Sequence, residues 1–285
     1  RAPAPPACPG LLSRRCPLAA RPPSTTCPPL RPAGLFLFAD PAADLGRVFV
    51  LARDGSVRPF LEEVDGVALP PSNFVFEDNR GRVWITVSTR CVPRALGYRR
   101  DVADGFVVLV DERGARIVAD GLGYTNEVVL DARGDWLYVN ETFARRTSRF
   151  PLRNDGSLGS RETFTEYGAG TFPDGMAFDE EGHLWVVSII SNRVLRVAPD
   201  GTTVTVLEDA DPGHVAWVEA AYLAGELDRP HLDGVKSRML RNISSVAFGG
   251  PDRRTAYLGC LLDDAIYAFP SPVAGLAPAH WNWPA

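Results

Sequence analysis

The stretch DGMAFDEEGHLWVVSI, which begins at Asp174, shows the pattern that organises most of the chain. It consists of a short apolar run, an aspartate, a glycine turn and a second apolar run that contains an aromatic residue. The same order recurs in NFVFEDNRGRVWITVS from Asn73, in NEVVLDARGDWLYVNET from Asn126 and, less regularly, in SSVAFGGPDRRTAYLGC from Ser244. Short apolar runs joined by such turns are typical of an all-β fold.

The spacing of these copies predicts a β-propeller. The first three copies begin about 50 residues apart, and the fourth follows after a longer interval. Further strand-like runs lie at 104–121 and 192–209, and a weaker unit covers 34–62. A period of this length with about four strands per unit is typical of a propeller blade. We therefore predict a six-bladed propeller over 34–285, with five recognisable units and an incomplete or irregular first blade.

The longer interval before the fourth copy predicts one inserted helix near 214–228. The segment HVAWVEAAYLAGELDRPHL has apolar residues at helical spacing and contains no proline before Pro230. Because a propeller needs no helix to complete a blade, we expect this helix to cover one face of the ring.

Residues 1–33 differ in composition from everything that follows. Proline, arginine, alanine and cysteine dominate this segment, and the first acidic residue of the chain is Asp40. Such a stretch does not bury enough apolar surface to fold by itself. We interpret it as an irregular, disordered or linker-like leader, and a wrong-frame start of a GC-rich coding sequence is the main alternative.

The overall composition excludes several classes of protein. The net charge is −5 and no basic run lies on an aromatic-rich face, so we expect no nucleic-acid partner. No window reaches the roughly 18 apolar residues of a membrane helix, which favours a soluble, cytoplasmic protein with no membrane partner. Five cysteines without a CxxC pair argue against a disulfide framework or a zinc site. The GxSxG, GxGxxG and HExxH motifs are absent, which leaves metal-assisted or non-catalytic functions.

One polar residue stands immediately before the first strand of each main repeat. These residues are Asn73, Asn126, Asp174 and Ser244. The innermost strands of a propeller start at one end of the central channel, so we expect the four side chains to converge there. Amide and carboxylate oxygens suit Ca²⁺ or Mg²⁺, and such a cation polarises a carbonyl group and lowers the pKa of bound water. Turn capping explains any one of these residues alone, but three in register favour a site.

Three segments carry a resemblance to a known family. FPDGMAFDEEGHLWVVSIISNRVLRVAPDG (172–201) resembles the PDG core of the gluconolactonase and senescence-marker-protein-30 proteins. YTNEVVLDARGDWLYVNET is similar to their Asn-Gly blade, and SSVAFGGPDRRTAYLG is similar to their last blade. The resemblance covers about 34–270 and implies a six-bladed propeller with one divalent cation at the channel mouth. It also implies hydrolysis of a sugar lactone or a related cyclic ester.

The resemblance implies a role for each residue of the predicted site. Carried over by position, Asn126 and Asp174 would be metal ligands. Asn73 and Asp174 would be catalytic, with Asn73 also binding the substrate or a metal-bound water. The resemblance favours Ca²⁺, and Mg²⁺, Mn²⁺ and Zn²⁺ stay open as alternatives. It names neither the lactone nor the oligomeric state.

The chain departs from the family pattern at three positions. A family glutamate at the start of the first blade completes the metal site, yet no acidic residue precedes Asp40. The aspartate that often follows the Asn73 position is Phe74 here, and the usual glycine after the second ligand is Glu127. We expect Glu127 to contact the substrate or to supply a compensating carboxylate. The alternative function is a non-catalytic or truncated propeller scaffold that has lost its metal site.

Overall fold

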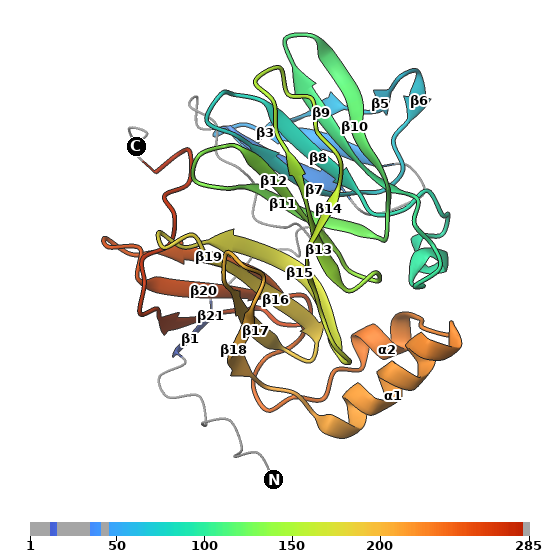
Figure 1. Cartoon of the computed structure of the whole chain (residues 1–285), viewed down its shortest axis with the longest axis vertical. Helices are drawn as coiled ribbons and strands as arrows, with labels where there is room; N and C mark the ends of the chain where they lie inside the picture. The colour runs from blue at the N-terminus through green and yellow to red at the C-terminus, as the bar shows by residue number, and fades with distance from the viewer. Residues whose placement is uncertain (1–11, 16–34, 41–45, 282–285) are drawn as a thin grey trace.

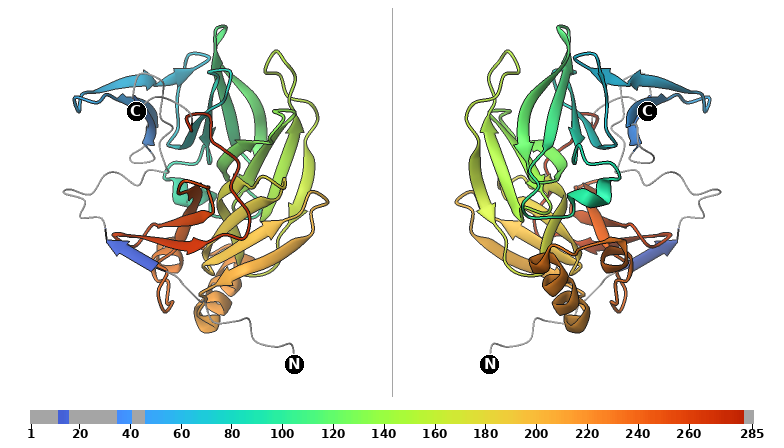
Figure 2. Two further views of the ribbon diagram at one scale, coloured as in Figure 1. Left: turned by 90° about the vertical axis from the view of Figure 1, so that its left-hand side faces the viewer. Right: turned by 90° about the vertical axis from the view of Figure 1, so that its right-hand side faces the viewer.

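The computed structural model describes residues 12–15, 35–40 and 46–281 of the 285-residue chain. Antiparallel sheets dominate, and Figures 1 and 2 show them arranged in turn around a common centre. Contacts between neighbouring sheets run from β2 to β7, β7 to β11, β11 to β15 and β15 to β19. The predicted all-β propeller is therefore confirmed.

Three blades have four strands each, and all of their strands are consecutive in the chain. The blades are β7 (Ser72–Glu77), β8 (Val83–Val87), β9 (Gly105–Asp111) and β10 (Gly114–Leu122); β11 (Thr125–Leu130), β12 (Trp136–Glu141), β13 (Arg146–Pro151) and β14 (Glu162–Glu166); and β15 (Thr171–Phe178), β16 (Leu184–Ile190), β17 (Arg193–Val197) and β18 (Thr203–Glu208). The first strand of each blade is the innermost.

The first and last blades are built differently. The first contains β2 (Phe36–Asp40), β3 (Arg47–Leu51) and β4 (Val57–Leu61), and a small hairpin of β5 (Glu63–Val64) and β6 (Val67–Ala68) follows it. The last contains β19 (Ile243–Gly249), β20 (Thr255–Cys260) and β21 (Ala265–Pro270). Its fourth strand is β1 (Leu12–Arg15), which pairs antiparallel with β21. These four residues of the predicted leader thus belong to the last blade.

The prediction of six blades is wrong for the described part of the chain, which forms five. A sixth blade needs several paired strands, but the described residues before β2 supply only β1, and β1 pairs with β21. The first described blade, made of β2, β3 and β4, is a three-stranded sheet. The other residues of the predicted leader lie outside the described part.

In the repeats that begin at Asn73, Asn126 and Asp174, the aspartate closes the turn between the first two strands. Asp179 Oδ1 accepts hydrogen bonds from the backbone N–H groups of Glu181 and His183. Its Oδ2 accepts from Trp185 Nε1 at 2.9 Å and from Arg196 Nε at 2.8 Å. Asp78 is bound in the same way by its own turn and by the indole of Trp84. The recurring aspartate and aromatic residue are therefore a structural pair.

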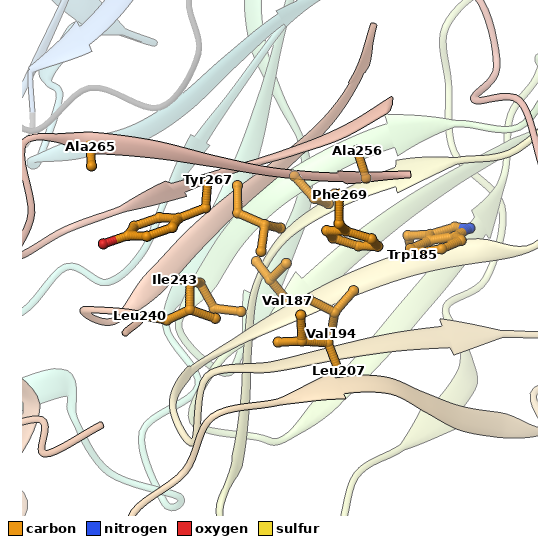
Figure 3. Packing of buried hydrophobic residues seen from close by; sticks show 12 residues of the cluster. Trp185, Val187, Val194, Leu207, Leu240, Ile243, Ala256, Ala265, Tyr267 and Phe269 are labelled. Atoms are coloured by element: carbon orange, nitrogen blue, oxygen red, sulfur yellow. The ribbon is translucent and has the colours of Figure 1, made fainter. Parts of the chain in front are cut away.

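Apolar side chains fill the space between neighbouring blades. Figure 3 shows this packing between the last two blades, where Trp185, Val187 and Val194 meet Ile243 and Phe269. The ring of Trp185 packs edge-on against Phe248, with 5.3 Å between the ring centroids. Alternate residues of each strand point into such layers, which explains why fully buried strands such as β16 are apolar almost throughout.

The predicted helix near 214–228 is confirmed as α1 (Pro212–Ala224), and a short helix α2 (Arg229–Asp233) follows it. Asp211 caps α1 by accepting the N–H of His214, and Gly225 ends the helix in the left-handed conformation. Tyr222 packs against Phe172 at the start of β15, with 5.3 Å between ring centroids. Helix α1 thus covers the end of the propeller at which β15 begins (Figure 1). No helix in the described residues is long and apolar enough to cross a membrane.

Replacement of Asp179 by alanine is expected to lower the free energy of unfolding by about 3 kcal/mol, because a buried indole and a guanidinium lose their acceptor. Urea denaturation measures the change. Asp200→Ala, which removes an exposed turn acceptor in the same blade, is the matched control and should cost under about 1 kcal/mol. Equal losses in the two variants would contradict the structural role of the repeat aspartate.

Candidate active site

The residues of the predicted polar column lie on the four neighbouring inner strands. Asn73 is on β7, Asn126 on β11, Asp174 on β15 and Ser244 on β19. Asn126 and Asp174 are 4% and 7% exposed, whereas Asn73 is only half-buried. The column therefore combines a buried pair with a neighbour that is open to solvent.

Asn126 lies at the centre of a hydrogen-bond network. Its Nδ2 donates to Thr142 Oγ1 at 3.0 Å, and its side chain also donates to the carboxylate of Asp174. Thr142 Oγ1 in turn donates to the carbonyl of Pro173 at 2.8 Å. With Nδ2 held in this way, Asn126 Oδ1 is buried and has no hydrogen-bond partner among the described residues. A buried carbonyl oxygen without a partner is costly, so this atom is suited to a ligand.

Asp174 is held by its backbone as well as by its side chain. Asn140 Nδ2 donates to the main-chain oxygen of Asp174 at 2.8 Å, and Thr147 Oγ1 donates to Asn140 Oδ1. Burial raises the pKa of the Asp174 carboxyl to about 7, although the hydrogen bond from Asn126 and the charge of Arg94 oppose this shift. The carboxyl group can therefore exchange a proton near neutral pH when no cation is present.

Glu127 is a second buried carboxylate, and it lies near Asp174. Its Oε2 accepts the backbone N–H of Met176 at 2.9 Å. Burial raises its pKa well above the usual range, and the negative charge of Asp174 adds to this shift. Gly175 leaves room for the arrangement, because a Cβ there would lie 3.2 Å from Glu127 Oε1 and 2.4 Å from the carbonyl oxygen of Ser244.

Asn73 reaches the same region from the preceding blade. Its Nδ2 donates to Ser88 Oγ at 2.8 Å and lies 3.5 Å from the carbonyl oxygen of Thr125, the residue before Asn126. Phe74, which stands where the family often has an aspartate, instead donates its backbone N–H to Thr86 Oγ1 within the blade. The half-buried amide of Asn73 is therefore the most open polar group of the column.

Sequence reasoning missed Arg94 as a member of this site. It lies on the short 3₁₀ helix η1 (Arg94–Gly97), and its Nε donates to the hydroxyl of Tyr124 at 2.9 Å. Its charge acts on Asp174. Beside Arg94, the ring of Tyr124 makes edge contacts with the rings of Tyr98 and Phe143. Because Arg94 lies in a loop that no other repeat contains, the repeat pattern carried no signal for it.

The donor atoms fit a hard divalent cation. Among the described residues no cluster of three or more His, Cys, Asp or Glu side chains is suited to a metal ion. The oxygens gathered here are instead two buried carboxylates, from Asp174 and Glu127, and the unpartnered amide oxygen of Asn126. Oxygen donors of this kind are those that Ca²⁺ and Mg²⁺ prefer. The site of the family glutamate lies before β2, outside the described part.

Comparison with family models gives a match over residues 21–218, to the SMP-30/gluconolactonase/LRE-like region. The chain belongs to the SMP-30/gluconolactonase/LRE-like family. The matched region includes Asn73, Asn126 and Asp174 and ends within α1.

Two relatives are similar in sequence. The 6-deoxy-6-sulfogluconolactonase of Pseudomonas putida is 30% identical over 190 residues, which are 64% of this chain and 53% of that protein. The pentonolactonase XacC of Haloferax volcanii is 28% identical over 225 residues, which are 73% of this chain and 64% of that protein. The chain thus spans between half and two thirds of the length of these relatives.

Solved structures of the family share the fold. A gluconolactonase from Xanthomonas campestris superposes with a TM-score of 0.61 at 17% identity, over 87% of this chain and 72% of its own. A calcium-binding regucalcin from Agrobacterium tumefaciens gives a TM-score of 0.54 at 17% identity, over 88% and 91% of the two chains. Likeness at this level of identity supports the propeller architecture.

Replacement of Asp174 by asparagine should stabilise chelator-treated protein at alkaline pH. The folded state binds the Asp174 proton more tightly than the unfolded chain, so the free energy of unfolding falls as the pH rises from 3.8 to about 7. Asparagine does not titrate, so the variant does not lose this part of the free energy of unfolding as the pH rises. We expect the variant's advantage in Tm to grow between pH 4 and 7 and to reach roughly 4 °C or more above pH 7. Scanning calorimetry checks this, and a difference independent of pH would contradict it.

Proposed function

We propose that this chain hydrolyses a sugar lactone or a related cyclic ester with the help of one divalent cation, with Ca²⁺ preferred. The observation that carries the proposal is the unpartnered buried oxygen of Asn126 beside the carboxylates of Asp174 and Glu127. Buried charges of one sign are stable only when an opposite charge offsets them. The names of the two sequence relatives support a lactone as the substrate class.

Asn126 and Asp174 would hold the cation, and Glu127 would replace the glutamate that the family places at the start of the first blade. A bound divalent cation supplies Lewis-acid polarisation of the lactone carbonyl and lowers the pKa of a water molecule. The network through Thr142 and Asn140 keeps Asn126 and Asp174 in place before substrate arrives.

The other residues bind and orient the lactone. Asn73 is the half-buried amide of the column and would bind the substrate next to Asp174. Asp174 would also accept the proton of the attacking water, because it is the buried carboxylate of the column. Arg94 places a positive charge near Asp174. This charge would stabilise the negative charge that develops on the lactone oxygen.

Hydrolysis of glucono-δ-lactone and a panel of five- and six-membered lactones tests the proposal, with a pH indicator as the readout. Protein treated with chelator should be inactive, and Ca²⁺, Mg²⁺, Mn²⁺ or Zn²⁺ should restore activity. Asp174→Asn should lower kcat/KM at least a hundredfold, because both a metal ligand and the proton acceptor are lost. Asp135→Asn removes an exposed carboxylate from a turn and should leave activity unchanged.

The same assay distinguishes a lactonase from the non-catalytic alternative. A folded protein, verified by circular dichroism, that hydrolyses no lactone with any of the four cations would contradict the lactonase proposal. Such a result would favour a propeller scaffold without a working metal site.

Glu127→Gln is expected to weaken Ca²⁺ binding at least tenfold. Glutamine keeps an oxygen that accepts the N–H of Met176, so the variant removes the charge and preserves the backbone contact. Isothermal titration calorimetry of Ca²⁺ against the metal-free protein measures the change. An unchanged Kd would show that Glu127 acts only in packing and does not replace the missing family glutamate.

A further inference from the structure

The loop between β8 and β9 begins beside the polar column. The end of β8 pairs with the start of β7, so the loop leaves the blade next to Asn73, whose Nδ2 donates to Ser88 Oγ at 2.8 Å. Thr89 Oγ1 donates to Asp104 Oδ1 at 2.6 Å and so ties the two ends of the loop together. The loop therefore holds its side chains at the end of the channel where the candidate active site lies.

Arg94 is held in this loop by an aromatic side chain. Its Nε donates to the hydroxyl of Tyr124 at 2.9 Å, and its guanidinium carbon lies 5.6 Å from the centroid of the Tyr124 ring. Tyr124 is buried, and its carbonyl accepts the N–H of Thr142 at 3.0 Å. Thr142 is also the residue that accepts a hydrogen bond from Asn126. The position of Arg94 is thus fixed relative to the predicted metal ligand Asn126.

Arg94 differs from every other arginine that is buried or half-buried within residues 46–281. Each of the others makes an ion pair with an aspartate or a glutamate, as Arg145 does with Glu219. Arg94 makes no ion pair with a described residue, and its Nη1 and Nη2 donate no hydrogen bond to one. These two nitrogens are not closed off from solvent, in contrast to Arg82 Nη1. Arg94 therefore has donors available to a ligand.

The charge of Arg94 would stay unbalanced when the proposed cation is bound. Asp174 is the carboxylate whose charge acts on Arg94. Asp174 and Glu127 together would carry two negative charges, which one divalent cation neutralises. Arg94 then adds a positive charge that no carboxylate offsets, and a partly buried charge without a partner is unfavourable. An anionic group on the substrate would supply this partner.

We propose that the preferred substrate is a lactone with a negatively charged substituent, which accepts hydrogen bonds from Arg94 Nη1 and Nη2. This inference rests on the proposed lactonase function and names its substrate class. A guanidinium binds a carboxylate through two parallel hydrogen bonds. Because the substituent keeps its charge throughout the reaction, this contact would be equally strong in the ground state and in the transition state. Its loss would therefore act mainly on KM.

Three matched pairs of lactones test the inference, with a pH indicator as the readout on cation-loaded protein. The pairs are D-glucono- and D-glucaro-1,4-lactone, D-galactono- and D-galactaro-1,4-lactone, and γ-butyrolactone and 5-oxotetrahydrofuran-2-carboxylate. We expect kcat/KM to be at least tenfold higher for the carboxylate member of one pair or more. Hydrolysis without this preference in any pair would overturn the inference and leave the proposed function intact. The absence of hydrolysis of every lactone would overturn both.

Variants of Arg94 separate recognition of the substituent from an effect on the reacting oxygen. Arg94→Met should raise KM for the preferred charged lactone at least tenfold, and Arg94→Lys, which keeps the charge without the planar donors, should retain part of the preference. Arg133→Met removes an exposed arginine from the turn at the other end of β11 and should leave the preference unchanged. Equal losses of kcat/KM for charged and neutral lactones in Arg94→Met would contradict the inference, because all lactones share the reacting oxygen.

A binding measurement reports on Arg94 independently of turnover. Tetrahydrofuran-2-carboxylate and tetrahydrofurfuryl alcohol have rings of the same size as the 1,4-lactones but contain no ester and are not hydrolysed. Isothermal titration calorimetry should show the carboxylate binding at least tenfold more tightly than the alcohol, and Arg94→Met should weaken binding of the carboxylate at least tenfold. An unchanged Kd in folded Arg94→Met protein would count against the inference. If that variant fails to fold, the lactone pairs and Arg94→Lys still decide.

Discussion

The hairpin formed by the first two strands of each blade is the unit on which the rest of the molecule depends. In the three blades that run from β7 to β18, its turn is held by an aspartate that binds backbone N–H groups, and in two of them the same carboxylate also binds a buried indole. This turn orients an inner strand that runs along the central channel. The start of each inner strand therefore reaches one end of the channel, and its turn reaches the other. The position of the candidate active site is a consequence of this geometry.

The starts of the inner strands hold buried polar groups that are not fully paired. At the starts, the carboxylates of Asp174 and Glu127 lie buried beside an amide oxygen that lacks a partner. A stable core does not need this arrangement, because burial of a polar group without a partner lowers stability.

The first blade shows how far the chain departs from a regular ring. Its described part has three strands, and the strand from the N-terminal segment completes the last blade instead. The family glutamate belongs to the position before β2. Glu127 stands where the family commonly has glycine, yet its carboxylate lies beside Asp174.

The sequence by itself determined the architecture, because strand-turn-strand repeats of about 50 residues specify a propeller through local hydrogen bonding and alternation. It also determined which polar residues start the inner strands, since Asn126 and Asp174 occupy the same place in the repeat. Only the tertiary structure decided the number of blades, the direction of Glu127, and the position of Arg94 near Asp174. These depend on contacts between blades and on loops outside the repeat, and no local periodicity encodes such contacts.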